Sequence, residues 1–134
     1  MPRPCRWFWR RPRLDAELRQ RIRQSFEAAA TDEEHFPSTI DPRIYHVRLI
    51  LEYLGDLAGR RVLDVGCGKG RFARILAERH PLARVWGLDI SLAMLKCVPA
   101  TVVKCAGSMT ELPFADGAFH AAYATESLEH AVEI

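Results

Sequence analysis

A glycine-rich turn contains the residues of this sequence whose types and spacing could do chemistry. Residues 62–73 read VLDVGCGKGRFA, so a short apolar run is followed by Gly66, Gly68 and Gly70 and then by a helical pattern. Glycines let a backbone turn tightly and approach a ligand that a Cβ atom would exclude. The free amides at the start of a helix attract an anion or a carboxylate. We therefore expect a nucleotide-like ligand at this turn.

Two kinds of ligand compete for the turn. Dinucleotides favour G-x-G-x-x-G or G-x-G-x-x-A, and Gly68-x-Gly70-x-x-Ala73 is a relaxed match. S-adenosylmethionine favours an acid and an apolar residue before G-x-G-x-G, a pattern that Asp64 and the residues up to Gly70 supply in full. A carboxylate at this position attracts the cationic ammonium and sulfonium groups of S-adenosylmethionine. It would repel the anionic pyrophosphate of a dinucleotide. Asp89, 19 residues after Gly70, ends the next expected strand, where its carboxylate can accept both hydroxyls of a ribose.

Three stretches of the sequence resemble the class I S-adenosylmethionine-dependent methyltransferases, in the small-molecule branch that includes ubiquinone/menaquinone-biosynthesis methyltransferases. They are residues 62–73, residues 87–91 (GLDIS) and residues 112–119 (LPFADGAF), and the resemblance spans about residues 45–134. The third stretch discriminates best, because dinucleotide-binding enzymes have no comparable loop before the fourth strand. The resemblance implies that S-adenosylmethionine is the cofactor and that a small molecule accepts the methyl group.

The resemblance also implies a role for each residue of the site. Asp64 and the glycine turn would lie near the methionine moiety, Asp89 would hold the ribose, and Ile90 would flank the adenine. Ser108 stands where the family often has an acid that contacts the adenine amine, and Met109 beside it can lie against the ring. The implied cofactor-binding residues are Asp64, Gly66, Cys67, Gly68, Gly70, Asp89, Ile90, Ser108 and Met109.

The segment after the fourth expected strand is where the family faces its methyl acceptor. We expect His130 to be the catalytic base, with Glu126 as the alternative, for an acceptor that must lose a proton of high pKa. Residues that open a helix are also often caps or exposed charges. Upstream, Tyr45 and His46 could cap the pocket, although we expect packing or surface roles for them. His120 stands where the family usually has Asp.

Alternating strand and helix patterns surround these residues. Upstream, an amphipathic helix is expected over 14–30, followed by a linker over 31–40 and a second helix to about Leu54, which Asp41 caps and Gly55 stops. The strands are expected at 61–65, 84–90, 101–105 and 119–125, with a helix at 72–80, a short helix that Ser91 caps and that runs to about 97, and a helical start at 127–134.

This alternation predicts an α/β fold, a Rossmann-like doubly wound parallel sheet with helices on both faces. By the resemblance, only the N-terminal half of the seven-stranded methyltransferase fold is present. The expected regions are a basic irregular arm (1–13), N-terminal helices (14–54) and an S-adenosylmethionine-binding Rossmann-like domain, incomplete at its C-terminus (55–134).

Composition and charge exclude several classes of protein. The 134 residues, 49% hydrophobic and 27% charged, are ordinary for one soluble globular domain. No apolar run reaches the roughly 18–20 residues of a membrane span, so we expect no transmembrane segment and a cytoplasmic location. The four cysteines and five histidines lack zinc-site spacing, so no metal is expected.

The basic residues concentrate at the N-terminus. Residues 1–23 hold eight arginines and two acids, a net charge of +6, whereas the remaining 11 basic and 15 acidic groups give −4. Such an arm could contact phosphate weakly, although a solvated extension is the simpler interpretation. We expect no other nucleic-acid contact.

These observations predict S-adenosylmethionine-dependent methyl transfer to a small-molecule or lipid-like acceptor. Because the chain stops soon after the fourth expected strand, we expect a fragment that supplies mainly the cofactor-binding half and has little activity alone. Two alternatives stay open: a nicotinamide-dependent Rossmann oxidoreductase, and a non-catalytic module that binds the cofactor or a partner. The sequence does not determine the acceptor or the oligomeric state.

Overall fold

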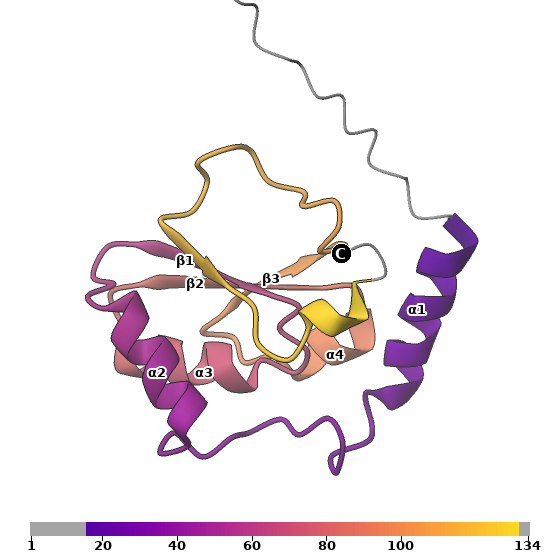
Figure 1. Ribbon diagram of the computed structural model, residues 1–134, viewed down its shortest axis with the longest axis horizontal. Coiled ribbons are helices and arrows are strands. Elements are labelled where there is room, and N and C mark those ends of the chain that lie inside the picture. The colour runs from indigo at the N-terminus through magenta and orange to yellow at the C-terminus, as the bar shows by residue number, and fades with distance from the viewer. Residues whose placement is uncertain (1–15, 132–134) are drawn as a thin grey trace, which may run out of the picture.

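The computed structural model describes residues 16–131 of the chain, so the expected basic arm lies outside the described residues. Two helices precede an alternation of strands and helices (Figure 1). The elements are α1 (Ala16–Ala29), α2 (Tyr45–Leu54), β1 (Arg61–Val65), α3 (Arg71–Arg79), β2 (Arg84–Asp89), α4 (Leu92–Cys97), β3 (Val103–Ala106), β4 (Ala121–Tyr123) and one 3₁₀ turn, η1 (Leu128–His130).

The four strands form one parallel sheet in the order β3-β2-β1-β4. Val62 of β1 lies opposite Val85 of β2 on one side and Ala121 of β4 on the other. Helices α2, α3 and α4 lie along one side of the sheet, and α1 stands across the carboxyl ends of the strands (Figure 1). The parallel sheet with flanking helices confirms the predicted α/β fold class, but within the described residues α2, α3 and α4 cover one face only, whereas helices were expected on both.

The main core lies between the sheet and these helices. Val62 and Val85 point to this side, where they pack against Ala73 and Leu76 of α3 and Leu95 of α4. All five side chains are buried. A second, smaller cluster joins α2 to α3 through Val47, Phe72 and Ile75.

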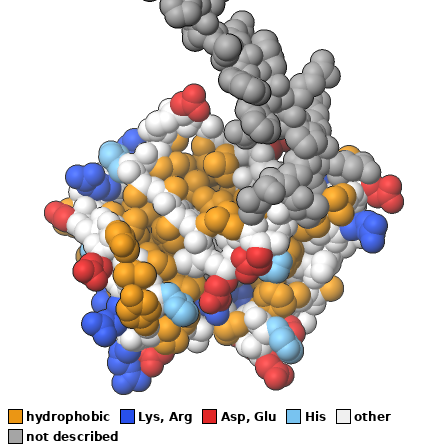
Figure 2. All heavy atoms as spheres, in the orientation of Figure 1, with side chains coloured by type: hydrophobic (Ala, Val, Ile, Leu, Met, Phe, Trp, Pro, Cys, Tyr) orange, Lys and Arg blue, Asp and Glu red, His pale blue; other side chains and the backbone are white. Residues whose placement is uncertain are grey.

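The opposite face of the sheet is covered by the loop over residues 107–120. Because neighbouring residues of a strand point to opposite faces, Trp86 faces away from the main core. Its ring packs edge-to-face on Phe114 and Phe119, with centroids 6.1 and 5.8 Å away. Figure 2 shows hydrophobic side chains gathered in the region between this loop and the sheet.

One predicted helix start is wrong. Asp41 does not cap the second helix: its carboxylate accepts hydrogen bonds from the backbone N–H (2.8 Å) and the guanidinium of Arg43 in a turn that precedes the helix. These bonds lower the pKa of Asp41 to about 2. Helix α2 begins later, at Tyr45, and Ile44 precedes it without any side-chain cap. Gly55 ends the helix as predicted, with φ +60°.

Other boundaries agree with the sequence or are shorter than predicted. The bounds of β1 are those expected, and Ser91 caps α4 by accepting the backbone N–H of Met94 at 3.1 Å. Strand β3 begins late because Val102 donates its N–H to Pro99 in a turn. Strand β4 and η1 are shorter than the ranges predicted for them, and β4 pairs with β1 alone within the described sheet.

The described residues hold neither a metal-binding cluster nor a membrane-spanning helix. Residues 16–131 contain no group of three or more His, Cys, Asp or Glu side chains that could hold a metal ion. No helix in the described part of the chain is both long enough and apolar enough to cross a membrane.

Candidate functional site

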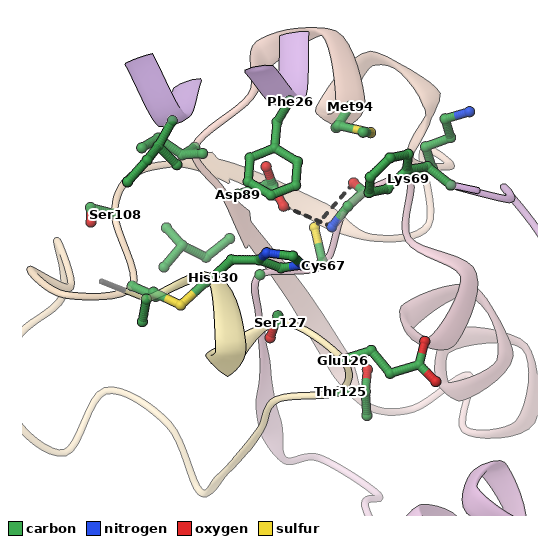
Figure 3. A pocket seen from close by; sticks show the side chains of 18 of the residues that line it. Phe26, Cys67, Lys69, Asp89, Met94, Ser108, Thr125, Glu126, Ser127 and His130 are labelled. Atoms are coloured by element: carbon green, nitrogen blue, oxygen red, sulfur yellow. Dashed lines mark hydrogen bonds between the residues drawn. The ribbon is translucent and has the colours of Figure 1, made fainter. Parts of the chain in front are cut away.

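The loops that follow β1 and β2 open into a pocket that α1 covers. Its cavity measures about 130 Å³. Residues of the glycine turn and Asp89 line one side, and Ile22 and Phe26 of α1 line the other. Figure 3 shows Phe26, Cys67 and Asp89 close together near its centre, with Thr125 and Glu126 at its rim. Ligands of open α/β sheets bind outside the carboxyl ends of the strands, which is where this pocket lies.

The glycine turn leaves its backbone bare beside the pocket. Gly66 and Gly68 both adopt positive φ, +74° and +55°, a region that other residues enter only at a cost. A Cβ atom at Gly66 would lie 2.6 Å from Cβ of Ser127, whereas one at Gly68 would meet nothing within 4 Å. The first glycine therefore allows close packing, and the second leaves open space beside the pocket.

Asp89 connects the two loops. Its Oδ2 accepts the backbone N–H of Gly68 at 2.8 Å, drawn as a dashed line in Figure 3, and its Oδ1 accepts that of Ser91 at 2.9 Å. Burial raises the pKa of this carboxyl, although both N–H groups oppose the change. A carboxylate has about four acceptor sites, so Asp89 can still accept hydroxyl groups from a ligand.

Asp64 lies deeper than the pocket wall. It is 1% exposed, and its Oδ2 accepts the hydroxyl of Tyr123 at 3.0 Å. Its Oδ1 is buried with no hydrogen-bond partner among residues 16–131. Burial raises the pKa of Asp64 to about 7. The residue is absent from the pocket lining, so the structure places it behind the pocket, with one carboxylate oxygen unpaired.

The residues predicted to surround the adenine do come together. Ile90, Ser108 and Met109 all line the pocket on the side of Asp89. The hydroxyl of Ser108 is already engaged, because it lies 2.8 Å from Oγ1 of Thr110 and accepts the backbone N–H of Thr110. Met109 reaches the glycine turn, with its terminal methyl 3.1 Å from where a Gly66 Cβ would be.

The two candidate bases lie in different surroundings. His130 lines the pocket, and its ring packs edge-to-face on that of Phe26 with centroids 5.1 Å apart. Glu126 has a left-handed backbone, φ +50°, and forms an ion pair with Arg71. Its carboxylate points away from the middle of the cavity (Figure 3). The geometry therefore favours His130 over Glu126 as the group that faces a ligand.

Three other predicted residues lie away from the pocket. Tyr45 is exposed and His46 lies 3.9 Å from the carboxylate of Glu126, and neither lines the main pocket. His120 accepts the backbone N–H of Arg61 at 3.0 Å, at the opposite end of β1. The histidine that stands here in place of the family's usual aspartate therefore lies away from the pocket.

Sequence reasoning missed several residues of the site. Phe26 and Phe36 line the pocket from the N-terminal region, but an apolar stripe on a helix by itself indicates only that the helix packs against something. Ser127 is buried against Gly66 and donates its hydroxyl to the carbonyl of Val65 at 2.9 Å. Lys69, inside the glycine turn, is also buried.

Comparisons with known proteins agree on a family. A family model described as a methyltransferase domain matches residues 63–134. Malonyl-[acyl-carrier protein] O-methyltransferase of Dechloromonas aromatica is 42% identical over 96 residues, which cover 72% of this chain and 36% of that protein. Trans-aconitate 2-methyltransferase of Rhodopseudomonas palustris is 43% identical over 56 residues, which cover 42% of this chain and 22% of that protein.

A solved structure gives the same result. The S-adenosylmethionine-dependent methyltransferase from Mesorhizobium loti has a TM-score of 0.56 to this chain at 26% identity, covering 64% of this chain and 41% of that one. The chain thus spans well under half the length of each of these relatives. None of these matches supports the nicotinamide alternative. The chain belongs to the class I S-adenosylmethionine-dependent methyltransferase family.

Proposed function

We propose that the pocket binds S-adenosylmethionine and that the chain supplies the cofactor-binding half of an enzyme that methylates a small-molecule or lipid-like acceptor. The observation that carries this proposal is the bond between Asp89 and the amide of Gly68. This bond joins the loops after β1 and β2 into one surface. On that surface Asp89 has acceptor sites left for a ligand, and the backbone of the glycine turn carries no side chain at Gly68. A nucleoside with an amino-acid tail fits such a surface, because it needs a ribose acceptor and close backbone approach at once.

Each part of the cofactor has candidate partners in the pocket. Asp89 would accept the ribose hydroxyls, and Ile90 and Met109 would lie against the adenine, with Ser108 at its edge. The glycine turn (Gly66, Cys67, Gly68 and Gly70) would hold the methionine moiety. Asp64 stands behind this turn with an unpaired oxygen. An unpaired buried polar atom costs ~1–3 kcal/mol, and the ammonium of the cofactor would offset this cost directly or through a bridging water.

When bound, S-adenosylmethionine supplies a methyl group on a sulfonium, an already activated leaving group. The whole enzyme must therefore hold the acceptor near and in line with this group, an effect worth up to ~7–11 kcal/mol. His130 is proposed to accept the proton of an acceptor that has to lose one, since its ring borders the pocket. An acceptor that is already ionised would not need this step.

Relatives support a small acceptor. The curated relatives described above are named for malonyl-[acyl-carrier protein] and for trans-aconitate. The basic arm and the cytoplasmic location stay predictions from the sequence.

Isothermal titration calorimetry tests the proposal on the full chain. S-adenosylmethionine and S-adenosylhomocysteine should give binding heat, and NAD and NADP should give none. Asp89→Ala should weaken the affinity by ~1–3 kcal/mol, because a buried hydrogen-bonded pair is lost. Asp116→Ala is the matched control, since this exposed aspartate lies away from the pocket lining. Heat from NADH with none from S-adenosylmethionine would overturn the proposal.

A further inference from the structure

An N-terminal segment crosses the pocket and is attached to the domain on both sides. We call residues 16–38, which comprise α1 and the turn after it, the N-terminal strap. On one side, the Glu27 carboxylate accepts the backbone N–H groups of Leu92 (2.7 Å) and Ala93 (3.1 Å) at the start of α4. On the other side, the strap meets the glycine turn at Lys69. The attachments therefore follow β2 and β1, the two strands whose loops form the pocket.

The attachment at Lys69 is a buried ion pair. The Lys69 ammonium donates to Oε1 of Glu33 at 2.6 Å and to the carbonyl of Asp32 at 3.2 Å, and its side chain is 1% exposed. A charge removed from water needs a paired partner, and losing that partner is strongly unfavourable. Glu33 is the one carboxylate in ion-pair range of Lys69 among the described residues. The pair therefore depends on the strap staying in place.

The surroundings of Glu33 hold its carboxylate ready for this contact. The backbone N–H and the hydroxyl of Ser38 both donate to it, at 2.9 and 2.5 Å. Together with the bond from Lys69, which is the largest cause, they lower the pKa of Glu33 to about 2. Glu33 thus stays ionised at any physiological pH.

The strap also forms one wall of the pocket. Phe26 and Phe36 line the cavity from the strap, and their rings pack edge-to-face with centroids 6.0 Å apart. The glycine turn and Asp89 line the same cavity from the domain. A ligand bound at the glycine turn is therefore covered by the strap.

We propose that Lys69 and Glu33 form a latch that holds the N-terminal strap over the bound cofactor, which makes Lys69 a positioning residue for cofactor retention. This inference rests on the proposed binding of S-adenosylmethionine. The latch couples the strap to the same turn that contacts the cofactor through its backbone. Opening it returns the Lys69 ammonium to water and leaves the pairing of the strands intact, so the latch controls the rate of cofactor release more than the stability of the domain.

The test measures the dissociation rate of S-adenosylhomocysteine from the full chain by surface plasmon resonance. Glu33→Gln keeps the shape of the side chain, which is 61% exposed, and removes its charge. It should raise the dissociation rate constant at least tenfold. Glu34→Gln is the matched control, because it removes the same charge from the adjacent exposed residue, and it should leave the rate unchanged.

Two further measurements separate a latch from a general structural role. Hydrogen exchange should speed up in residues 31–38 of Glu33→Gln, with no change in β1 or β2. The double variant Glu33→Gln/Lys69→Met should release the ligand no faster than Lys69→Met alone, since each substitution breaks the same Lys69–Glu33 ion pair. If Lys69→Met does not fold, the comparison of Glu33→Gln with Glu34→Gln decides.

The outcomes distinguish the two proposals. Absence of S-adenosylhomocysteine binding by the unaltered chain would refute the proposed function, and the latch with it. Binding with equal dissociation rates in the unaltered chain and in Glu33→Gln would refute the latch alone.

Discussion

The buried carboxyl group of Asp64, one of whose oxygens lacks a hydrogen-bond partner among the described residues, makes the stability of the domain depend on pH. Burial raises its pKa in the folded state to about 7, against an ordinary value of 3.8 for an aspartate in water. Between these two values the unfolded chain has released the proton and the folded chain still holds it. Stability falls as pH rises wherever the folded state binds more protons. Asp64 therefore destabilises the fold progressively as pH rises from about 4 to about 7, and Asp64→Asn removes this dependence.

The size of the effect follows from the two pKa values. Each pKa unit corresponds to about 1.36 kcal/mol, so the contribution of Asp64 to the free energy of unfolding falls by about 3 kcal/mol between pH 5 and pH 8. Asparagine keeps the size of the side chain and can still accept the hydroxyl of Tyr123. The stability of Asp64→Asn relative to the unaltered chain should thus increase by this amount over the same range.

Urea denaturation at pH 5, 6, 7 and 8, followed by circular dichroism, measures this difference without any ligand. Asp116→Asn is the control, because it changes the charge in the same way at an exposed position. The relative stability of the control should not change with pH. A pH-independent difference between Asp64→Asn and the unaltered chain would show that Asp64 is not held protonated, and the reasoning from its burial would fail.

Two further predictions concern the turn and a helix cap. Gly66→Ala combines a left-handed φ, which costs ~1–2 kcal/mol, with a contact of 2.6 Å to Ser127, which adds ~1–3 kcal/mol. Gly68→Ala meets only the first cost, so urea denaturation should find Gly66→Ala the less stable variant; equal losses would contradict the contact. Ser91→Ala should lower stability by ~1 kcal/mol through loss of the α4 cap, measured as a lower thermal midpoint, and an unchanged midpoint would count against that cap.

Local signals in the sequence were enough to predict most elements of the fold. β1 has the predicted bounds because a β-branched apolar run is bounded by a charged residue and a glycine. Ser91 was predicted as a cap correctly, since its hydroxyl accepts the backbone N–H of Met94, three residues further on. Asp41 was predicted as a cap wrongly, because the backbone N–H of Arg43 that it accepts belongs to a turn, and the helix begins only at Tyr45. A capping bond can be predicted from spacing, but whether a helix follows it directly depends on the rest of the structure.

The glycine turn, the acid after β2 and the alternation of strands and helices could be predicted from the sequence, because each depends on neighbouring residues. The far wall of the pocket could not, because it comes from residues distant in the chain. Lys69 and Glu33 are 36 residues apart, and Phe26 reaches His130 across most of the chain. Tertiary structure also placed Asp64 behind the turn rather than in the pocket lining. Contacts between distant residues depend on how the helices pack on the sheet. That packing depends on the burial of many side chains together, so it cannot be predicted from a local sequence pattern.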